Sequence, residues 1–140
     1  MSDKNFQELA SLFFEMRQTI RANLPRGKAD PNDWMRCETL RFIDQKRPTM
    51  QEVARQLRIT APSATSLARK LKKLGWITRT SAEKDKRVVR IALTAKGERE
   101  LDRYRRQSEK TMRKVFSRLQ ERDLSHLKRA LRNLKDIHAA

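Results

Sequence analysis

The sequence predicts a mainly helical fold that carries one small β-hairpin. Only three Gly and four Pro occur in 140 residues, and Leu, Ile, Phe and Met recur every three or four positions among charged residues, a pattern typical of amphipathic helices. One stretch departs from it, because the runs "WITRT" and "VVRIAL" enclose the strongly charged residues 81–87. Alternating apolar and polar residues in these runs indicate two strands joined by a loop.

The first two helices are predicted over residues 3–24 and up to Lys46. Apolar residues of the first recur on one face, namely Phe6, Leu9, Phe13, Met16, Ile20 and Leu24. The following "LPRGKADPND" holds two Pro and one Gly and predicts a connector. Asn32 or Asp33 can cap the second helix, which should end near Lys46 because Pro48 disfavours helical backbone at the residue before it.

Two short helices should follow, separated by a tight turn. The segment "TMQE" is a capping-box pattern, in which the Thr49 hydroxyl and the Glu52 carboxylate bond backbone N–H groups at the helix start. The fourth helix can be capped by Thr60, tolerates Pro62 in its first turn, and should stop at Gly75.

The fourth helix has two contrasting faces. Its apolar stripe consists of Ala64, Leu67, Ala68, Leu71 and Leu74. At about 100° per residue, the opposite face consists of Pro62, Thr65, Ser66, Arg69 and Lys73. This face is therefore slim and hydroxylated at the helix start and cationic further on.

A hairpin and two more helices complete the chain. The inward residues of the strands should be Ile77, Val89, Ile91 and Leu93. Thr94 can cap a long helix that carries Leu101, Tyr104, Met112, Phe116 and Leu119. Asp123 or Ser125 can start a last helix that carries Leu124, Leu127, Leu131, Leu134 and Ile137.

The positive charge is concentrated in the middle of the chain. The formal net charge is +17, and residues 34–97 hold sixteen basic and five acidic side chains. Residues 1–33 hold five of each. A basic segment of this kind favours a polyanion, because Lys and Arg release condensed counterions when they bind phosphates. Nucleic acid is the expected partner; the alternative is that the charge only keeps the chain soluble.

Other classes of protein find little support. No apolar run reaches the ~20 residues that cross a bilayer, and the N-terminus lacks a basic start followed by an apolar block. We therefore expect a cytoplasmic protein without a membrane segment. The single cysteine, Cys37, fits a reducing compartment. His126 and His138 are the only histidines, and no Cys, His or carboxylate cluster has metal-ligand spacing, so we expect no catalytic residues, no cofactor and no metal.

The order of elements is that of a winged helix-turn-helix. The major groove of double-stranded DNA admits one helix whose first turns are slim, and its side chains can then meet base edges. Arg69 can pair bidentately with guanine, while Lys73 is placed for a phosphate. The expected contacts on this helix are Thr60, Pro62, Ser63, Thr65, Ser66, Arg69 and Lys73. The alternative is a surface helix whose cations are only solvated.

Residues 49–97 resemble the MarR family of bacterial transcriptional regulators. The resemblance rests on the helix-turn-helix, on Asp85 and Arg87 as an Asp-x-Arg pair in the loop, and on "LTAKG" after the second strand. It implies that Arg87 enters the minor groove and is held by Asp85. The cations Lys84, Lys86 and Arg90 lie close to them in the sequence and are expected to bind DNA with them. A loop without Gly agrees with this, since a tight hairpin would need Asn-Gly or a similar turn.

The resemblance also implies a homodimer. In one domain of residues 1–140, residues 33–97 would form the DNA-binding region, and residues 1–32 and 98–140 the helical dimerisation region. A two-fold dimer reads an inverted repeat, its recognition helices ~34 Å apart. The alternative by pattern alone is that the terminal helices fold back on their own subunit. We expect a repressor; the rival function is an architectural protein that binds any DNA sequence.

An effector site is a further expectation from the resemblance, because members of the family often bind small aromatic ligands between the dimer helices and the DNA-binding region. Phe13, Met16, Trp34 and Arg36 are the candidate residues. Aromatic and Met residues at helical spacing are, however, more often part of a core. Cys37 lies inside the second helix, and nothing nearby indicates a reactive thiol, so an inert buried side chain is expected.

Overall fold

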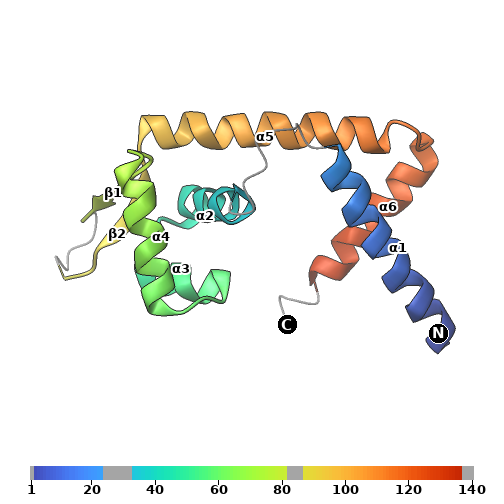
Figure 1. Ribbon diagram of the computed structural model, residues 1–140, viewed down its shortest axis with the longest axis horizontal. Coiled ribbons are helices and arrows are strands. Elements are labelled where there is room, and N and C mark those ends of the chain that lie inside the picture. Colours follow the sequence, from blue (N-terminus) through green and yellow to red (C-terminus); the bar gives the residue numbers. More distant parts are fainter. Residues whose placement is uncertain (1, 24–32, 82–86, 137–140) are drawn as a thin grey trace. The chain divides into compact units, whose positions relative to one another are not determined.

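The computed structural model describes residues 2–23, 33–81 and 87–136. This part of the chain contains six helices and one antiparallel pair of strands (Figure 1), which confirms the predicted fold class. The elements are α1 (Asp3–Ala22), α2 (Asp33–Lys46), α3 (Met50–Leu57), α4 (Ala61–Lys73), β1 (Ile77–Thr80), β2 (Arg90–Leu93), α5 (Ala95–Phe116) and α6 (Glu121–Asp136).

The chain forms two compact units. One comprises Met1–Gly27 and Gln107–Ala140, and the other Lys28–Arg106. The second unit contains the helix-turn-helix and the hairpin, so the DNA-binding region predicted over residues 33–97 lies within it. None of the described helices is long and apolar enough to cross a membrane.

Three threonine caps set the boundaries of the helices in the second unit. The cap oxygens accept backbone N–H groups three residues on, in the pairs Thr49 and Glu52 (3.3 Å), Thr60 and Ser63 (3.2 Å), and Thr94 and Gly97 (3.0 Å). All three caps were predicted from the sequence, because a side-chain oxygen at the helix start replaces a missing backbone acceptor. They fix where α3, α4 and α5 begin.

The core of the second unit lies between α2, α4, the hairpin and the start of α5. Its buried residues are Leu40, Ile43, Leu71, Trp76, Ile77, Ile91, Leu101 and Tyr104. The predicted stripe of α4 is buried at Ala64 and Leu71, but Leu74 is 39% exposed. Leu74 is the C-cap residue, where the chain leaves the helix, so it no longer continues the stripe.

The prediction that Val89 points inward is also wrong. Ile77 and Ile91 are buried and Leu93 packs against the core, yet Val89 is 44% exposed. The paired strand begins only at Arg90, with Thr80 opposite Arg90 and Ile77 opposite Leu93. Val89 therefore lies beyond the end of the hydrogen-bonded ladder, where the core no longer covers the hairpin.

Gly97 allows the first turn of α5 to approach the hairpin closely. A Cβ atom at this position would lie 2.0 Å from the carbonyl oxygen of Trp76. The same oxygen accepts the backbone N–H of Thr94 at 3.0 Å, and the Thr94 hydroxyl donates to the carbonyl of Gly75. The "LTAKG" segment thus joins the start of α5 to the backbone of Gly75 and Trp76, directly before β1.

In the first unit, α1 has no buried residue. Its exposed apolar side chains are Phe6 (51%), Leu9 (45%), Leu12 (53%), Phe13 (52%) and Phe14 (61%). On α6, Leu131 and Leu134 are 50% and 54% exposed. The predicted stripes of α1 and α6 are therefore exposed at these positions, whereas Met16, Ile20, Leu124 and Leu127 are partly buried. Leu24 and Ile137 lie outside the described residues.

The ends of the last two helices differ from those predicted. The helix α5 ends at Phe116, so Leu119 follows it, and α6 begins at Glu121 rather than near Asp123 or Ser125. The backbone N–H of Leu124 already bonds the carbonyl of Gln120 at 3.0 Å. The earlier start places both Glu121 and Asp123 in the first turn, where carboxylates interact favourably with the helix dipole.

Candidate nucleic-acid interface

The free face of α4 is formed by the residues that the sequence singled out. Thr60, Pro62, Ser63, Thr65, Ser66, Arg69 and Lys73 are all exposed. The Thr60 hydroxyl donates to the Ser63 hydroxyl at 2.9 Å, and the Thr65 hydroxyl donates to the carbonyl of Ala61 at 3.0 Å. These local bonds hold the hydroxyl oxygens close to the helix, so the first turns stay slim.

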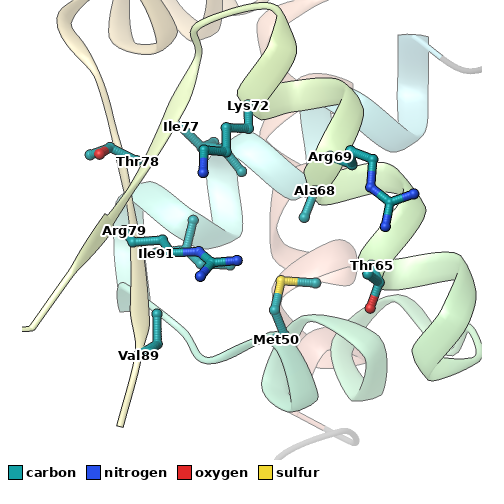
Figure 2. A pocket seen from close by; sticks show the side chains of 10 residues that line it. All are labelled: Met50, Thr65, Ala68, Arg69, Lys72, Ile77, Thr78, Arg79, Val89 and Ile91. Carbon is teal, nitrogen blue, oxygen red and sulfur yellow. The ribbon is translucent and has the colours of Figure 1, made fainter. Parts of the chain in front are cut away.

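A groove of about 480 Å³ runs between α4, the hairpin and the start of α3 (Figure 2). It is lined by Met50, Thr65, Ala68, Arg69, Lys72, Ile77, Thr78, Arg79, Val89 and Ile91. Arg69 and Lys72 extend from α4, and Arg79 extends from the paired strands on the other side. The groove therefore has apolar side chains between cationic ones, and it adjoins the free face of α4.

Lys72 and Arg79 were missed by the sequence predictions. Lys72 lies three positions after Arg69, which places both on one side of the helix. Arg79 lies two positions after Ile77 and opposite Ile91 in the hairpin, so it shares their face of the sheet. Both spacings can be read from the sequence. The two cations share one groove, however, only because α4 and β1 face each other in the tertiary structure.

The charged loop is only partly described. Lys84, Asp85 and Lys86 lie outside the described residues, so the proposed contact of Asp85 with Arg87 remains a prediction. Arg87 is exposed and lies three residues before β2. The guanidinium of Arg90 donates to the carbonyl of Arg47 at 3.2 Å, and its predicted clustering with Lys84 and Lys86 stays a prediction.

The candidate effector residues belong to both units. Phe13 and Met16 lie on α1 in the first unit, while Trp34 and Arg36 are positions of α2 in the second. Their joint role stays a prediction. Cys37 is partly buried and packs against the core of the second unit. Among the described residues, no group of three or more His, Cys, Asp or Glu side chains could hold a metal ion.

Two helices joined by a tight turn and followed by a hairpin define a winged helix-turn-helix protein (Figure 1). Residues 33–88, which include both helices of the motif, match the model of the MarR family. This part of the chain is therefore similar to the MarR family, the family that its sequence resembles. No curated protein sequence matches the chain.

Solved structures share the fold over almost the whole chain. A MarR family protein from Bacillus stearothermophilus has a TM-score of 0.81 and 21% identity, with 100% of this chain and 99% of that chain covered. FabT of Streptococcus pneumoniae, in complex with DNA, has a TM-score of 0.67 and 22% identity, with 97% and 96% covered. MepR of S. aureus, bound to ethidium bromide, has a TM-score of 0.61 and 20% identity, with 97% and 96% covered.

Proposed function

We propose that this protein is a transcriptional regulator that binds double-stranded DNA at specific sequences. The observation that supports this most directly is the free face of α4, where hydroxyl groups at the helix start give way to Arg69 beside a groove lined with cations. A protein that reads bases needs such a face, because the major groove accepts a helix only if its leading turns are slim.

The side chains of this face have different expected roles. Thr65 and Ser66 can bond base edges, and Arg69 can pair bidentately with the O6 and N7 atoms of guanine. The groove is lined by Lys72 and Arg79, and Lys73 lies in the last turn of α4. Single cations at these positions suit phosphate oxygens. We thus propose that the start and middle of α4 read the base sequence, and that the cations beside it position the protein on the DNA backbone.

Arg87 is assigned to the minor groove. It is exposed and lies three residues before β2, at the end of the charged stretch 81–87. A narrow minor groove has an enhanced negative potential that attracts an inserted guanidinium. Asp85 would hold this guanidinium by a charge-assisted hydrogen bond.

The same proposal includes a homodimer on an inverted-repeat operator. The exposed Phe and Leu side chains of α1 are an apolar surface that a second copy of the chain would cover. A two-fold dimer would present two α4 helices to half-sites about one helical turn, ~34 Å, apart. The fold shared with FabT, whose structure contains DNA, supports the DNA-binding part of the proposal.

We further propose that the protein represses transcription and is released from DNA by a small aromatic ligand near Phe13, Met16, Trp34 and Arg36. The support is a shared fold with MepR, whose structure contains ethidium bromide. A thermal-shift screen with small aromatic compounds tests the ligand. A compound that raises the melting temperature should also weaken operator binding, and stronger binding in its presence would contradict release.

One experiment separates this function from the alternative, which is an architectural protein that binds any DNA sequence. The net charge of +17 favours that alternative. Bound sequences are selected from a random DNA pool at two salt concentrations. A regulator should enrich an inverted repeat that it binds at least ~10³ times more tightly than random DNA. Recovery of unenriched DNA at both salt concentrations would support the architectural function and refute the regulator.

A further inference from the structure

Arg90 lies on the face of the hairpin opposite the groove. Its neighbours in the chain, Val89 and Ile91, both line the groove (Figure 2). Successive side chains of a strand point to opposite faces. The guanidinium of Arg90 is therefore directed away from the surface that carries Arg69, Lys72 and Arg79.

Arg90 contacts the turn that joins α2 to α3 and the first turn of α3. Its Nη1 atom donates to the carbonyl of Arg47 at 3.2 Å and lies 3.9 Å from Oε2 of Glu52. The adjacent backbone N–H of Ile91 donates to the carbonyl of Pro48 at 2.9 Å. The strand β2 is thus attached to this turn at two neighbouring residues.

The turn itself is firmly held, which makes it a suitable anchor. Pro48 is fully buried, and the backbone N–H of Arg47 bonds the carbonyl of Ile43 at 2.9 Å. Arg47 has a left-handed backbone conformation with φ of 44°, and Thr49 caps α3 directly afterwards. A group bound to this turn is therefore fixed relative to the start of α3.

We propose that Arg90 is a positioning residue that fixes the hairpin against the α2–α3 turn and thereby sets the reach of Arg87 relative to α4. The proposal rests on the DNA-binding function above. The core holds the hairpin through Ile77 and Ile91, whereas the Arg90 bond to Arg47 fixes the end of β2 nearest the charged loop. Because this donor is charged, its bond is stronger than a neutral one, whereas the exposed ion pair with Glu52 adds little.

The geometry makes the effect on DNA recognition large. Arg87 lies in a turn three residues before Arg90, so the two Cα atoms are at most about 10 Å apart. A rotation of about 10° at β2 would therefore move Arg87 by up to about 2 Å. This is enough to break a hydrogen bond, since such bonds weaken sharply within less than 1 Å.

The test compares Arg90→Gln with Arg79→Gln in the full-length protein, on a selected operator and on scrambled DNA over a range of salt. The two arginines lie on paired strands, but only Arg79 faces the groove. Arg79→Gln should lower the salt slope by about 0.9 for one lost phosphate contact. Arg90→Gln should leave the slope unchanged and lower the ratio of operator to scrambled affinity by about tenfold.

Arg90→Lys, which keeps the charge, should give an intermediate loss of this ratio, because an ammonium can bond one carbonyl but lacks the planar fork. It also serves as the variant if Arg90→Gln does not fold. If Arg90→Gln lowers the salt slope as Arg79→Gln does, with an unchanged ratio, Arg90 is a phosphate contact and the proposal is overturned. An unchanged slope together with an unchanged ratio overturns it as well.

Hydrogen exchange tests the attachment without DNA. The amide of Ile91 should exchange about tenfold faster in Arg90→Gln than in the wild type, while the amide of Trp76, which bonds the carbonyl of Leu71, should not change. Equal protection of Ile91 in both proteins would refute the attachment. If the wild type enriches no operator, the proposed function fails, but the exchange result still decides whether Arg90 holds the hairpin.

Discussion

At the scale of single residues, the exposed cations near α4 should divide into readers of sequence and binders of phosphate. Arg69 borders the groove and shares its helix side with Lys72, whereas Lys73 lies in the last turn of α4. Bidentate pairing of an arginine with guanine distinguishes bases, but a lysine at a phosphate does not. Substitution of a sequence reader should therefore change the preference among bases, whereas substitution of a phosphate binder should weaken binding to all sequences.

Arg69→Ala should relax the choice of base at one major-groove position by about 1 to 3 kcal/mol. Lys73→Ala is the matched control, which should weaken binding to all sequences by a similar factor. Both are measured by competition binding with operators that carry single base changes. Equal loss on every operator for Arg69→Ala would show that this residue does not read a base.

Arg87→Ala should weaken binding most at operators whose flanks are rich in A·T pairs. Such flanks have a narrow minor groove with a strong negative potential, and the lost interaction depends on that potential. Operators with A·T and G·C flanks are compared in the same titration. A loss that is independent of the flanks would place Arg87 outside the minor groove.

At the scale of elements, the join between β1 and α5 depends on close backbone contact. Gly97→Ala would place a Cβ atom 2.0 Å from the Trp76 carbonyl oxygen, so the backbone must shift. We expect destabilisation of about 3 kcal/mol or more, since overpacking commonly costs about 1 to 3 kcal/mol even where side chains can adjust. Urea unfolding followed by circular dichroism measures the loss.

Gly75→Ala is the matched control for the same join. Gly75 has φ of 77°, but the nearest atom that its Cβ would meet is 3.7 Å away. The expected cost is only about 1 to 2 kcal/mol for a left-handed backbone. If Gly97→Ala were no more destabilising than Gly75→Ala, the close contact with Trp76 would not govern the stability of this join.

At the scale of the whole molecule, the uncovered apolar side chains of α1 predict a dimer. Leu9 is 45% exposed on the stripe of α1, whereas Gln18 lies on its opposite side. Wild-type protein should sediment as a dimer at micromolar concentration. Leu9→Glu should dissociate it, because a buried unpaired carboxylate is costly, while Gln18→Glu should remain a dimer. A stable wild-type monomer would disprove the prediction.

Local features could be predicted because their causes lie within a few residues. The caps at Thr49, Thr60 and Thr94 each act on a backbone N–H three residues on, so the sequence alone placed the starts of α3, α4 and α5. The exposure of Thr65, Ser66 and Arg69 followed from the helical period for the same reason. The sequence does not show where the hydrogen-bonded ladder of β2 ends, so it wrongly predicts that Val89 belongs to the core.

The class of fold and the free face of α4 follow from the sequence, because periodicity, caps and the helix-turn-helix pattern are encoded in neighbouring residues. Which cations share a surface depends on how the helices and strands pack. Lys72 and Arg79 meet at one groove, while Arg90 turns away to a carbonyl forty-three positions earlier in the chain. Each of these side chains adds the same unit to the net charge, but the pairing of strands and the packing of helices determine toward which surface each side chain points.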